Sequence, residues 1–293
     1  MALAIATNNS ALQAAAAASS VNSSMETSME RLSTGKRINS AADDAAGVAI
    51  ASRLSSEVRG TNQGIRNALD GQALIDTAEG AHREIENLLQ RMREIAVQAS
   101  NDTNNAQDRA NLQAEMDAMV TEVDRIAKAT TFAGLSLLNG NAAGDADSNA
   151  AVSFQVGSAT GTDNQIAINI GSMTAETLNL ADTDNDNLLL VMADTNSAFD
   201  ANLHTVSGAS ATATGNALEA ITIIDAAITT VNTQRSTLGA TSNRLNHTVN
   251  NLTNISANLS SAKGRIEDAD FAIETTKLAK NQILQQASTA MLA

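Results

Sequence analysis

The chain has 293 residues, of which 43% are hydrophobic, and its formal net charge is −14. It contains four Phe and no Trp, Tyr, Pro or Cys, so a core must be built from Ala, Leu, Ile, Val and Met, which suits seams between helices. This composition excludes disulfides and thiolate metal sites, and the negative charge argues against nucleic acid or an anionic membrane as the main partner.

The first 54 residues predict two helices with a short joint between them. Apolar residues spaced by three or four predict the first helix, which we expect to end at Gly35 because glycine adopts the left-handed conformation at low cost. We expect Ser40 to cap the second helix, with Asp43 and Asp44 in its first turn, where the helix dipole favours negative charge.

Two amphipathic helices are predicted after this joint. Apolar residues between about 50 and 99 are spaced by three, four, six or seven, which predicts one long helix. A second helix is predicted at about 108–128, with apolar residues on one face and most acidic residues on the other. The polar sequence SNDTNN marks the loop between them.

The pattern changes from helical spacing to alternation after Gly140. Two groups of alternating apolar residues are separated by GSATGTDN, which predicts a β-hairpin: Val152, Phe154 and Val156, then Ile166, Ile168 and Ile170. Residues 181–215 are rich in Asp, Asn, Ser, Thr, Gly and Ala, and we expect an exposed segment with little core of its own.

The C-terminal part carries the strongest pattern of the chain. An apolar residue recurs at every seventh position: Ile224, Val231, Leu238, Leu245, Leu252, Leu259, Ile266 and Ile273. This spacing predicts a coiled-coil helix of about 50 residues, and we expect Gly264 to break or bend it. We therefore predict a mainly α fold, a long antiparallel helical rod or coiled coil built from both chain ends, with a small β-hairpin region.

The three histidines give no catalytic motif. His82, His204 and His247 lie far apart, and none of them belongs to an H-E-x-x-H motif. The sequence also lacks G-x-S-x-G, Walker-type and G-x-G-x-x-G motifs. Each histidine is interpreted as a solvated helix or loop residue, and we predict that the chain is not an enzyme.

One segment resembles the start of a calcium-binding loop. Asp182, Asp184 and Asp186 occupy its first, third and fifth positions. The rest of the pattern fails, because Asn187 replaces the glycine of the sharp turn and Ala193 replaces the bidentate carboxylate. We therefore expect no metal and no cofactor.

Three segments carry a family resemblance: ERLSTGKRINSAADDAAGVAIASRL, NLLQRMREIAVQASNDTN and SAKGRIEDADFAIETTKLAKNQILQQASTAMLA. They resemble the terminal signatures of bacterial flagellins, in the family's order and at opposite ends of the chain, and the similarity covers about residues 1–180 and 216–293. The resemblance implies three regions: an inner terminal coiled-coil domain from 1–36 and 264–293, an outer-core helical rod with the β-hairpin from 37–180 and 216–263, and a short exposed variable segment at 181–215.

The resemblance implies a structural subunit that self-assembles into the extracellular flagellar filament for swimming motility. It also implies export in an unfolded state through the flagellar type III apparatus, without a cleaved signal peptide. The N-terminal segment agrees with this, because no basic region precedes a sustained apolar run. We expect residues up to about 36 and beyond about 264 to be disordered in the monomer, because a narrow apolar stripe buries too little surface to offset ordering.

Two other functions stay open at this point. A hook–filament junction protein of the flagellum shares the terminal helices but usually carries a longer middle segment. A secreted receptor ligand or adhesin would need a substantial folded middle domain, which the short segment at 181–215 does not offer.

The resemblance implies a homo-oligomer, a helical filament of many copies. It also implies four kinds of partner: flagellar cap proteins, hook-junction proteins, a flagellin export chaperone and the host flagellin-sensing Toll-like receptor. Lys36, Arg37, Asp43 and Asp44 are candidates for charge pairing between subunits, with simple complementarity to the helix ends as the alternative.

Two further residue sets follow from the resemblance. The candidates for receptor contact are Gln90, Arg91, Glu94, Ile95, Gln98 and Glu115. These residues also have a simpler role in packing neighbouring subunits, so we expect the receptor to reach them only in monomers. The candidates for chaperone contact lie on an amphipathic C-terminal segment and are Phe271, Ile273, Leu278, Ile283 and Leu284.

Overall fold

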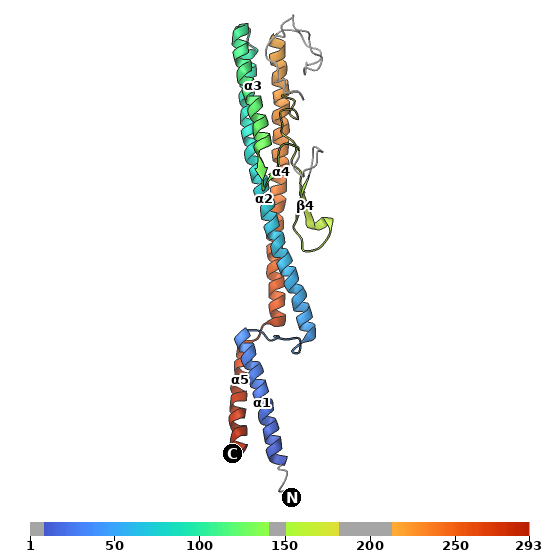
Figure 1. Ribbon diagram of the computed structural model, residues 1–293, viewed down its shortest axis with the longest axis vertical. Coiled ribbons are helices and arrows are strands. Elements are labelled where there is room, and N and C mark those ends of the chain that lie inside the picture. The colour runs from blue at the N-terminus through green and yellow to red at the C-terminus, as the bar shows by residue number, and fades with distance from the viewer. Residues whose placement is uncertain (1–8, 141–150, 182–212, 293) are drawn as a thin grey trace. The chain divides into compact units, whose positions relative to one another are not determined.

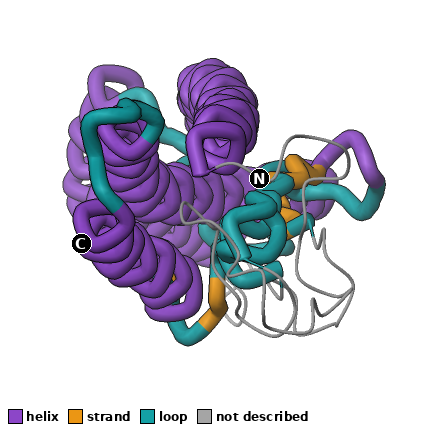
Figure 2. The backbone as a smooth tube through the Cα atoms, turned by 90° about the horizontal axis from the view of Figure 1, so that it is seen from above, coloured by secondary structure: helices purple, strands orange, loops and turns teal. Residues whose placement is uncertain are grey.

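The computed structural model describes residues 9–140, 151–181 and 213–292 (Figure 1). The elements, in chain order, are α1 (Asn9–Thr34), α2 (Ala45–Ala99), α3 (Ala106–Ala129), β1 (Thr131–Phe132), β2 (Leu135–Ser136), β3 (Val152–Gln155), the short 3-10 helix η1 (Thr162–Asn164), β4 (Gln165–Ile168), α4 (Ala213–Glu267) and α5 (Phe271–Leu292). Figure 2 shows helix along most of the described chain and strands only in short segments, so the predicted mainly α class is confirmed.

The chain divides into two compact units. The terminal unit contains Met1–Asn62 and Thr253–Ala293, and the central unit contains Gln63–Leu252. Helices α2 and α4 contribute to both units, whereas α1 and α5 belong to the terminal unit and α3 and the four strands to the central unit. The segment that resembles a calcium loop, at 182–193, and most of the predicted variable segment lie outside the described residues.

The central unit is built from α2, α3 and α4 around one apolar core. Its largest fully buried side chains are Leu74, Ile75, Ile85, Leu89, Met92, Ile95, Met116, Leu137, Leu138, Ile168, Ile170 and Met173. The heptad residues of α4 from 224 to 245 join this core and are at most 1% exposed. Fully burying one Leu, Ile or Met side chain contributes about 1.5–3 kcal/mol, so this core gives the central unit its own source of stability.

Two short hairpins belong to the central unit. Strands β3 and β4 pair antiparallel, with Val152 opposite Ile168, and this confirms the predicted hairpin. The β1–β2 hairpin has strands of only two residues, which are too short to show alternation in the sequence. Its turn is made by Ala133 and Gly134, both with positive φ (51° and 85°), as in a tight two-residue turn.

Gly64 of α2 allows the β3–β4 hairpin to pack closely against this helix. A Cβ atom added to Gly64 would lie 2.1 Å from the carbonyl oxygen of Val156, so only glycine allows the helix to approach this backbone. Asn67, one turn later, donates from its side-chain amide to the carbonyl of Gln155 at 2.7 Å. These contacts fix the end of β3 on the face of α2.

Helices α1 and α5 pair antiparallel in the terminal unit (Figure 1). The side-chain amide of Gln285 donates to Asn22 at 2.7 Å, and the hydroxyl of Ser28 donates to Glu274 at 2.9 Å. Both contacts join residues more than 240 positions apart in the sequence. The predicted pairing of the two chain ends is therefore confirmed.

The heptad seam is fully buried only from Ile224 to Leu245. Leu252 and Leu259 are half-buried, and Ile273, its last member, is 55% exposed. The spacing predicted a seam with a break or bend at Gly264, whereas full burial ends earlier, after Leu245. The spacing persists in the sequence, but from Leu252 onwards these side chains are partly or largely open to solvent.

The break near the C-terminus lies later than predicted. Helix α4 continues through Gly264 to Glu267, and a Cβ atom at position 264 would lie only 2.6 Å from the carboxylate of Asp268. This glycine therefore makes room for a neighbouring side chain and does not end the helix. Asp270 begins α5, because its carboxylate accepts hydrogen bonds from two backbone N–H groups of the first turn at 2.9 and 3.2 Å.

The joint between α1 and α2 agrees with the prediction at one end only. Helix α1 ends as expected, with Gly35 following it at φ +71°. The predicted cap at Ser40 is wrong, because α2 begins at Ala45 and a capping side chain must reach an N–H two or three residues ahead. Asp44 meets this requirement, and its carboxylate accepts from the N–H of Gly47 at 2.9 Å.

Candidate assembly and recognition surfaces

Lys36 and Arg37 contact the C-terminal end of α4. The Lys36 ammonium lies 3.3 Å from the Glu267 carboxylate, and the Arg37 guanidinium donates to the carbonyl of Ile266 at 2.8 Å. The N–H of Arg37 also donates to the carbonyl of Glu267 at 2.6 Å. Cations are favoured at a helix C-terminus, so these two residues tie the joint after α1 to the end of α4.

Asp43 and Asp44 bond within their own joint. The Asp43 carboxylate accepts from the N–H groups of Ser40 and Asn39 at 2.8 and 3.0 Å, and these bonds hold its pKa below the usual value. Asp44 caps α2, as described above. The structure therefore gives all four predicted assembly residues partners inside the chain, and it does not pair the two cations with the two carboxylates.

Helices α1 and α5 expose large apolar side chains. The exposed members are Leu12 and Met29 of α1, and Phe271, Ile273, Ile283 and Leu284 of α5. Four of the five predicted chaperone contacts belong to this set, and the fifth, Leu278, is half-buried. Large apolar side chains gathered on one pair of helices are typical of an interaction surface.

The predicted receptor residues lie on α2 and α3 of the central unit. Arg91 links the two helices, because its guanidinium lies 2.9 Å from Glu94 and 3.0 Å from Glu115. Hydrogen bonds to these two carboxylates raise the pKa of Arg91. Together with Gln90 and Gln98, these residues are exposed.

Ile95 differs from the other five receptor candidates. It is 1% exposed and belongs to the core of the central unit. This corrects the prediction for Ile95, because its side chain lies on the apolar face of α2 that joins this core and is not available for surface contact.

His82 is fully buried in α2, so the prediction that it is solvated is wrong. Neither ring nitrogen has a hydrogen-bond partner in the described chain. Burial, and to a smaller extent the charge of Arg235, lower the pKa of His82 to about 4. Its place in the apolar stripe of α2 is the sequence signal that could have revealed this burial. His247 is exposed as predicted, and His204 lies outside the described residues.

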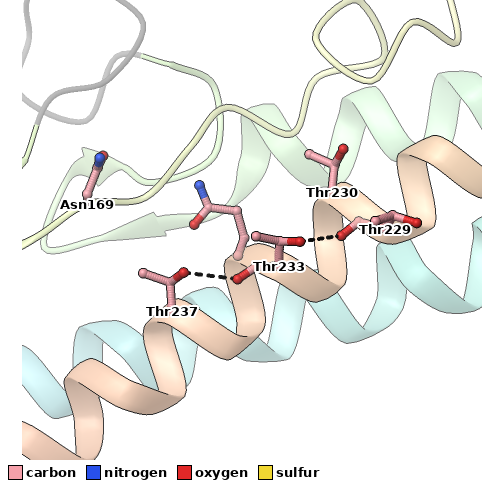
Figure 3. Close-up of a pocket in the computed structure, with 6 residues that line it drawn as sticks. Asn169, Thr229, Thr230, Thr233 and Thr237 are labelled. Atoms are coloured by element: carbon pink, nitrogen blue, oxygen red, sulfur yellow. Dashed lines mark hydrogen bonds between the residues drawn. The ribbon is translucent and has the colours of Figure 1, made fainter.

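A polar groove lies between α4 and the segment after β4 (Figure 3). It has a volume of about 360 Å³ and is lined by Asn169, Thr229, Thr230, Thr233, Gln234 and Thr237. The threonine hydroxyls donate to carbonyls one turn earlier in α4, as Thr233 does to Thr229 at 2.8 Å. The lining contains no charged group and no activated nucleophile, so it offers no catalytic arrangement.

The two units differ in net charge. The terminal unit contains nine Lys and Arg and nine Asp and Glu, whereas the central unit contains nine Lys and Arg and 23 Asp and Glu. The central unit therefore carries the whole net charge of −14.

In the described ranges, no three His, Asp or Glu side chains gather where they could hold a metal ion. No helix of these ranges combines the length and hydropathy needed to cross a membrane.

Comparison with known proteins assigns both ends of the chain to one family. Residues 5–143 match the family model of the bacterial flagellin N-terminal helical region, and residues 221–293 match that of the C-terminal helical region. The chain belongs to the bacterial flagellin family. The matched residues of this flagellin include α1, α2, α3 and α5 and most of α4, and they contain all the predicted assembly, receptor and chaperone residues.

Curated flagellins of Vibrio species are similar to this flagellin. Flagellin B of Vibrio cholerae serotype O1 is 43% identical over 177 residues, which cover 60% of this chain and 45% of that protein. Polar flagellin F of Vibrio parahaemolyticus is 45% identical over 168 residues, which cover 57% of this chain and 43% of that protein. The matched region thus covers less than half the length of each of these curated relatives.

A solved structure described as a flagellar hook-associated protein from Vibrio parahaemolyticus has a similar fold. It aligns with a TM-score of 0.57 and 16% sequence identity, and the alignment covers 77% of this chain and 100% of that one. At this identity the likeness concerns the fold alone, and it does not favour a hook-junction role over a filament role.

Proposed function

We propose that this flagellin is a structural subunit of the bacterial flagellar filament, outside the cell, and that many copies associate through their terminal units. The observation that supports this proposal most directly is the exposure of large apolar side chains on α1 and α5, whereas the central unit buries its own core. A neighbouring copy that fully covered Phe271 or Ile283, which are 56% and 67% exposed, would stabilise the assembly by about 1–2 kcal/mol for each side chain.

The distribution of charge supports the same division of roles. A terminal unit without net charge lets copies approach with little repulsion, whereas the acidic central units repel one another and favour soluble monomers. Salt shortens the range of this repulsion to about 10 Å at 0.1 M. We therefore expect assembly to be promoted by salt.

The proposed role is mechanical, and it needs no catalysis. In the filament, residues 1–36 and 264–293 would form the inner coiled-coil domain, residues 37–180 and 216–263 the outer helical part that transmits torque, and residues 181–215 the solvent-facing segment. Export through the type III apparatus without a cleaved signal peptide belongs to this proposal.

The proposed partners use different surfaces of the chain. The exposed residues of α5 fit a chaperone that keeps an apolar segment from aggregating before assembly, and Arg91 with its two carboxylates fits a receptor that meets monomers. Flagellar cap and hook-junction proteins would meet the ends of the filament. The proposed contacts of Lys36, Arg37, Asp43 and Asp44 with neighbouring copies would have to coexist with their bonds inside the chain.

Electron microscopy of the purified full chain tests the proposal. After seeding with filament fragments or precipitation with salt, we expect long tubular filaments. A variant with Ile283→Ser and Leu284→Ser should remain monomeric under the same conditions, whereas the control variant Glu26→Gln, which changes an exposed polar residue of α1, should assemble. Soluble monomers of the unmodified chain under every condition would contradict the filament role.

A further inference from the structure

The fully buried side chains at the contact between α1 and α5 are polar. Among the described side chains of these two helices, the buried ones are Ser28, Glu274 and Ser288, at 3%, 5% and 9% exposure. No apolar side chain described on these helices is fully buried: Val21, Met25, Leu32 and Leu278 are half-buried, and the other large apolar ones are exposed. Apolar interlocking, which usually fixes how two helices align, is therefore weak at this contact.

Glu274 is the centre of the polar interior. One carboxylate oxygen accepts from the hydroxyl of Ser28 at 2.9 Å and lies 3.9 Å from the Arg31 guanidinium, while the other lies 3.1 Å from the Lys277 ammonium. Burial raises the pKa of Glu274, but the bonds from Lys277 and Ser28 outweigh it and hold the pKa below the usual value. The carboxylate is therefore ionised, and α1 supplies two of its three partners.

A buried carboxylate is costly when it loses its partners, so it favours the one alignment that keeps them. If α5 slipped by one turn along α1, Ser24 or Leu32 would replace Ser28 opposite Glu274, and Thr27 or Gly35 would replace Arg31. Either slip removes the cation that α1 contributes. We propose that Glu274, held by Ser28 and Arg31, determines the register in which α1 and α5 pair.

A second contact agrees with this register. Gln285, three turns along α5, donates to Asn22 on α1 at 2.7 Å, and both side chains lie near the surface. An exposed amide pair of this kind contributes little to register by itself, but it marks the alignment that Glu274 sets. The inference concerns contacts inside one chain and does not depend on the filament role.

The absence of cysteine makes this register measurable by cross-linking. The pair Asn22→Cys with Gln285→Cys reports the observed register, and the pair Asn22→Cys with Asn281→Cys reports a slip of one turn. Each cysteine pair is introduced into the full chain. The protein is treated with a short thiol cross-linker, once as dissolved monomer and once as sedimented polymer, and gel mobility measures the cross-linked fraction. In the unmodified background we expect the first pair to cross-link at least about ten times more than the second.

Replacing Glu274 should change this ratio without abolishing pairing. In a Glu274→Leu background, we expect the ratio to fall about tenfold while the summed cross-linking is retained, because an apolar residue can pack in either register. Glu274→Gln keeps an acceptor for Ser28 but loses the charge, so its ratio should be intermediate. Glu30→Leu removes an exposed carboxylate of α1 and should leave the ratio unchanged.

Several outcomes would overturn the inference. An unchanged ratio in Glu274→Leu would show that other contacts set the register. Loss of both cross-links in that variant would show that Glu274 holds the helices together and does not select their alignment. Equal cross-linking of the two pairs in the unmodified background, or none in either preparation, would show that the observed register is not maintained.

Discussion

The helix seams of the two units bury opposite kinds of side chain. In the central unit the heptad residues of α4 from 224 to 245 are at most 1% exposed and join an apolar core. In the terminal unit the buried side chains described on α1 and α5 are Ser28, Glu274 and Ser288, while their large apolar residues are half-buried or exposed. Heptad spacing therefore specifies a helix with an apolar face, whereas the structure around the helix decides whether that face is buried.

The largest expected difference in stability comes from replacing one leucine by alanine in each unit. Leu89→Ala should lower the free energy of unfolding of the monomer by about 2–5 kcal/mol, because Leu89 is fully buried and its removal leaves a cavity. Leu284→Ala, at a leucine that is 40% exposed, should change it by less than about 0.5 kcal/mol. Urea unfolding followed by circular dichroism measures both values.

The same two variants should exchange their rank in an assembly assay. Leu284→Ala should reduce the yield of sedimented polymer more than Leu89→Ala does at a temperature where both monomers are folded. Equal losses of monomer stability in the two variants would remove the proposed difference between the units.

Acid should weaken the central unit through His82. In the folded chain this histidine stays neutral down to about pH 4, whereas in the unfolded chain it takes up a proton near pH 6.5. Stability is therefore complete above pH 6.5 and is lost as the pH falls towards 4, by up to about 3 kcal/mol. Unfolding at pH 7 and pH 4.5 should show most of this loss in the unmodified chain.

Two histidine variants isolate this effect from the titration of carboxylates. His82→Leu should reduce the loss between pH 7 and pH 4.5, because it removes the buried titrating group. His247→Leu changes an exposed histidine and should keep the loss unchanged. If both variants behaved like the unmodified chain, His82 would not be the source of the acid sensitivity.

A smaller effect on stability is expected where α2 packs against the β3–β4 hairpin. Gly64→Ala should destabilise the central unit by about 1–3 kcal/mol, because the new Cβ atom would overlap the carbonyl oxygen of Val156. Gly80→Ala, in the same helix with no atom within 4 Å of the added Cβ, should stabilise it by about 0.5–1 kcal/mol. Thermal unfolding compares the two, and a shift of the same sign in both would contradict this assignment.

The smallest effect on the monomer is expected at the joint. Lys36→Glu with Arg37→Glu removes surface contacts to the end of α4, and exposed ion pairs contribute about 0–1 kcal/mol. Helicity of the monomer should change little, whereas the yield of polymer should fall if the joint also contacts neighbouring copies. If helicity of the monomer and yield of polymer fell together, Lys36 and Arg37 would act only through their contacts inside the chain.

Sequence patterns predicted where the helices lie better than which of their side chains are buried. Local spacing and a glycine were sufficient to predict the end of α1, the extent of α3 and the β3–β4 pairing. The cap of α2 was misplaced because Ser40 and Asp44 are both good caps, and only the position of the first turn distinguishes them. The burial of His82 and the fading of the seam beyond Leu245 depend on contacts with distant segments, which spacing along one helix does not reveal.

Backbone hydrogen exchange on monomer and assembled filament tests the difference between the units most directly. We expect amides of α1 and α5 to exchange at least about 100 times more slowly in the filament than in the monomer, because assembly covers their exposed apolar side chains. Amides around Leu89 should be protected to the same extent in both forms. Protection of α1 and α5 that is equally strong in the monomer would contradict the account.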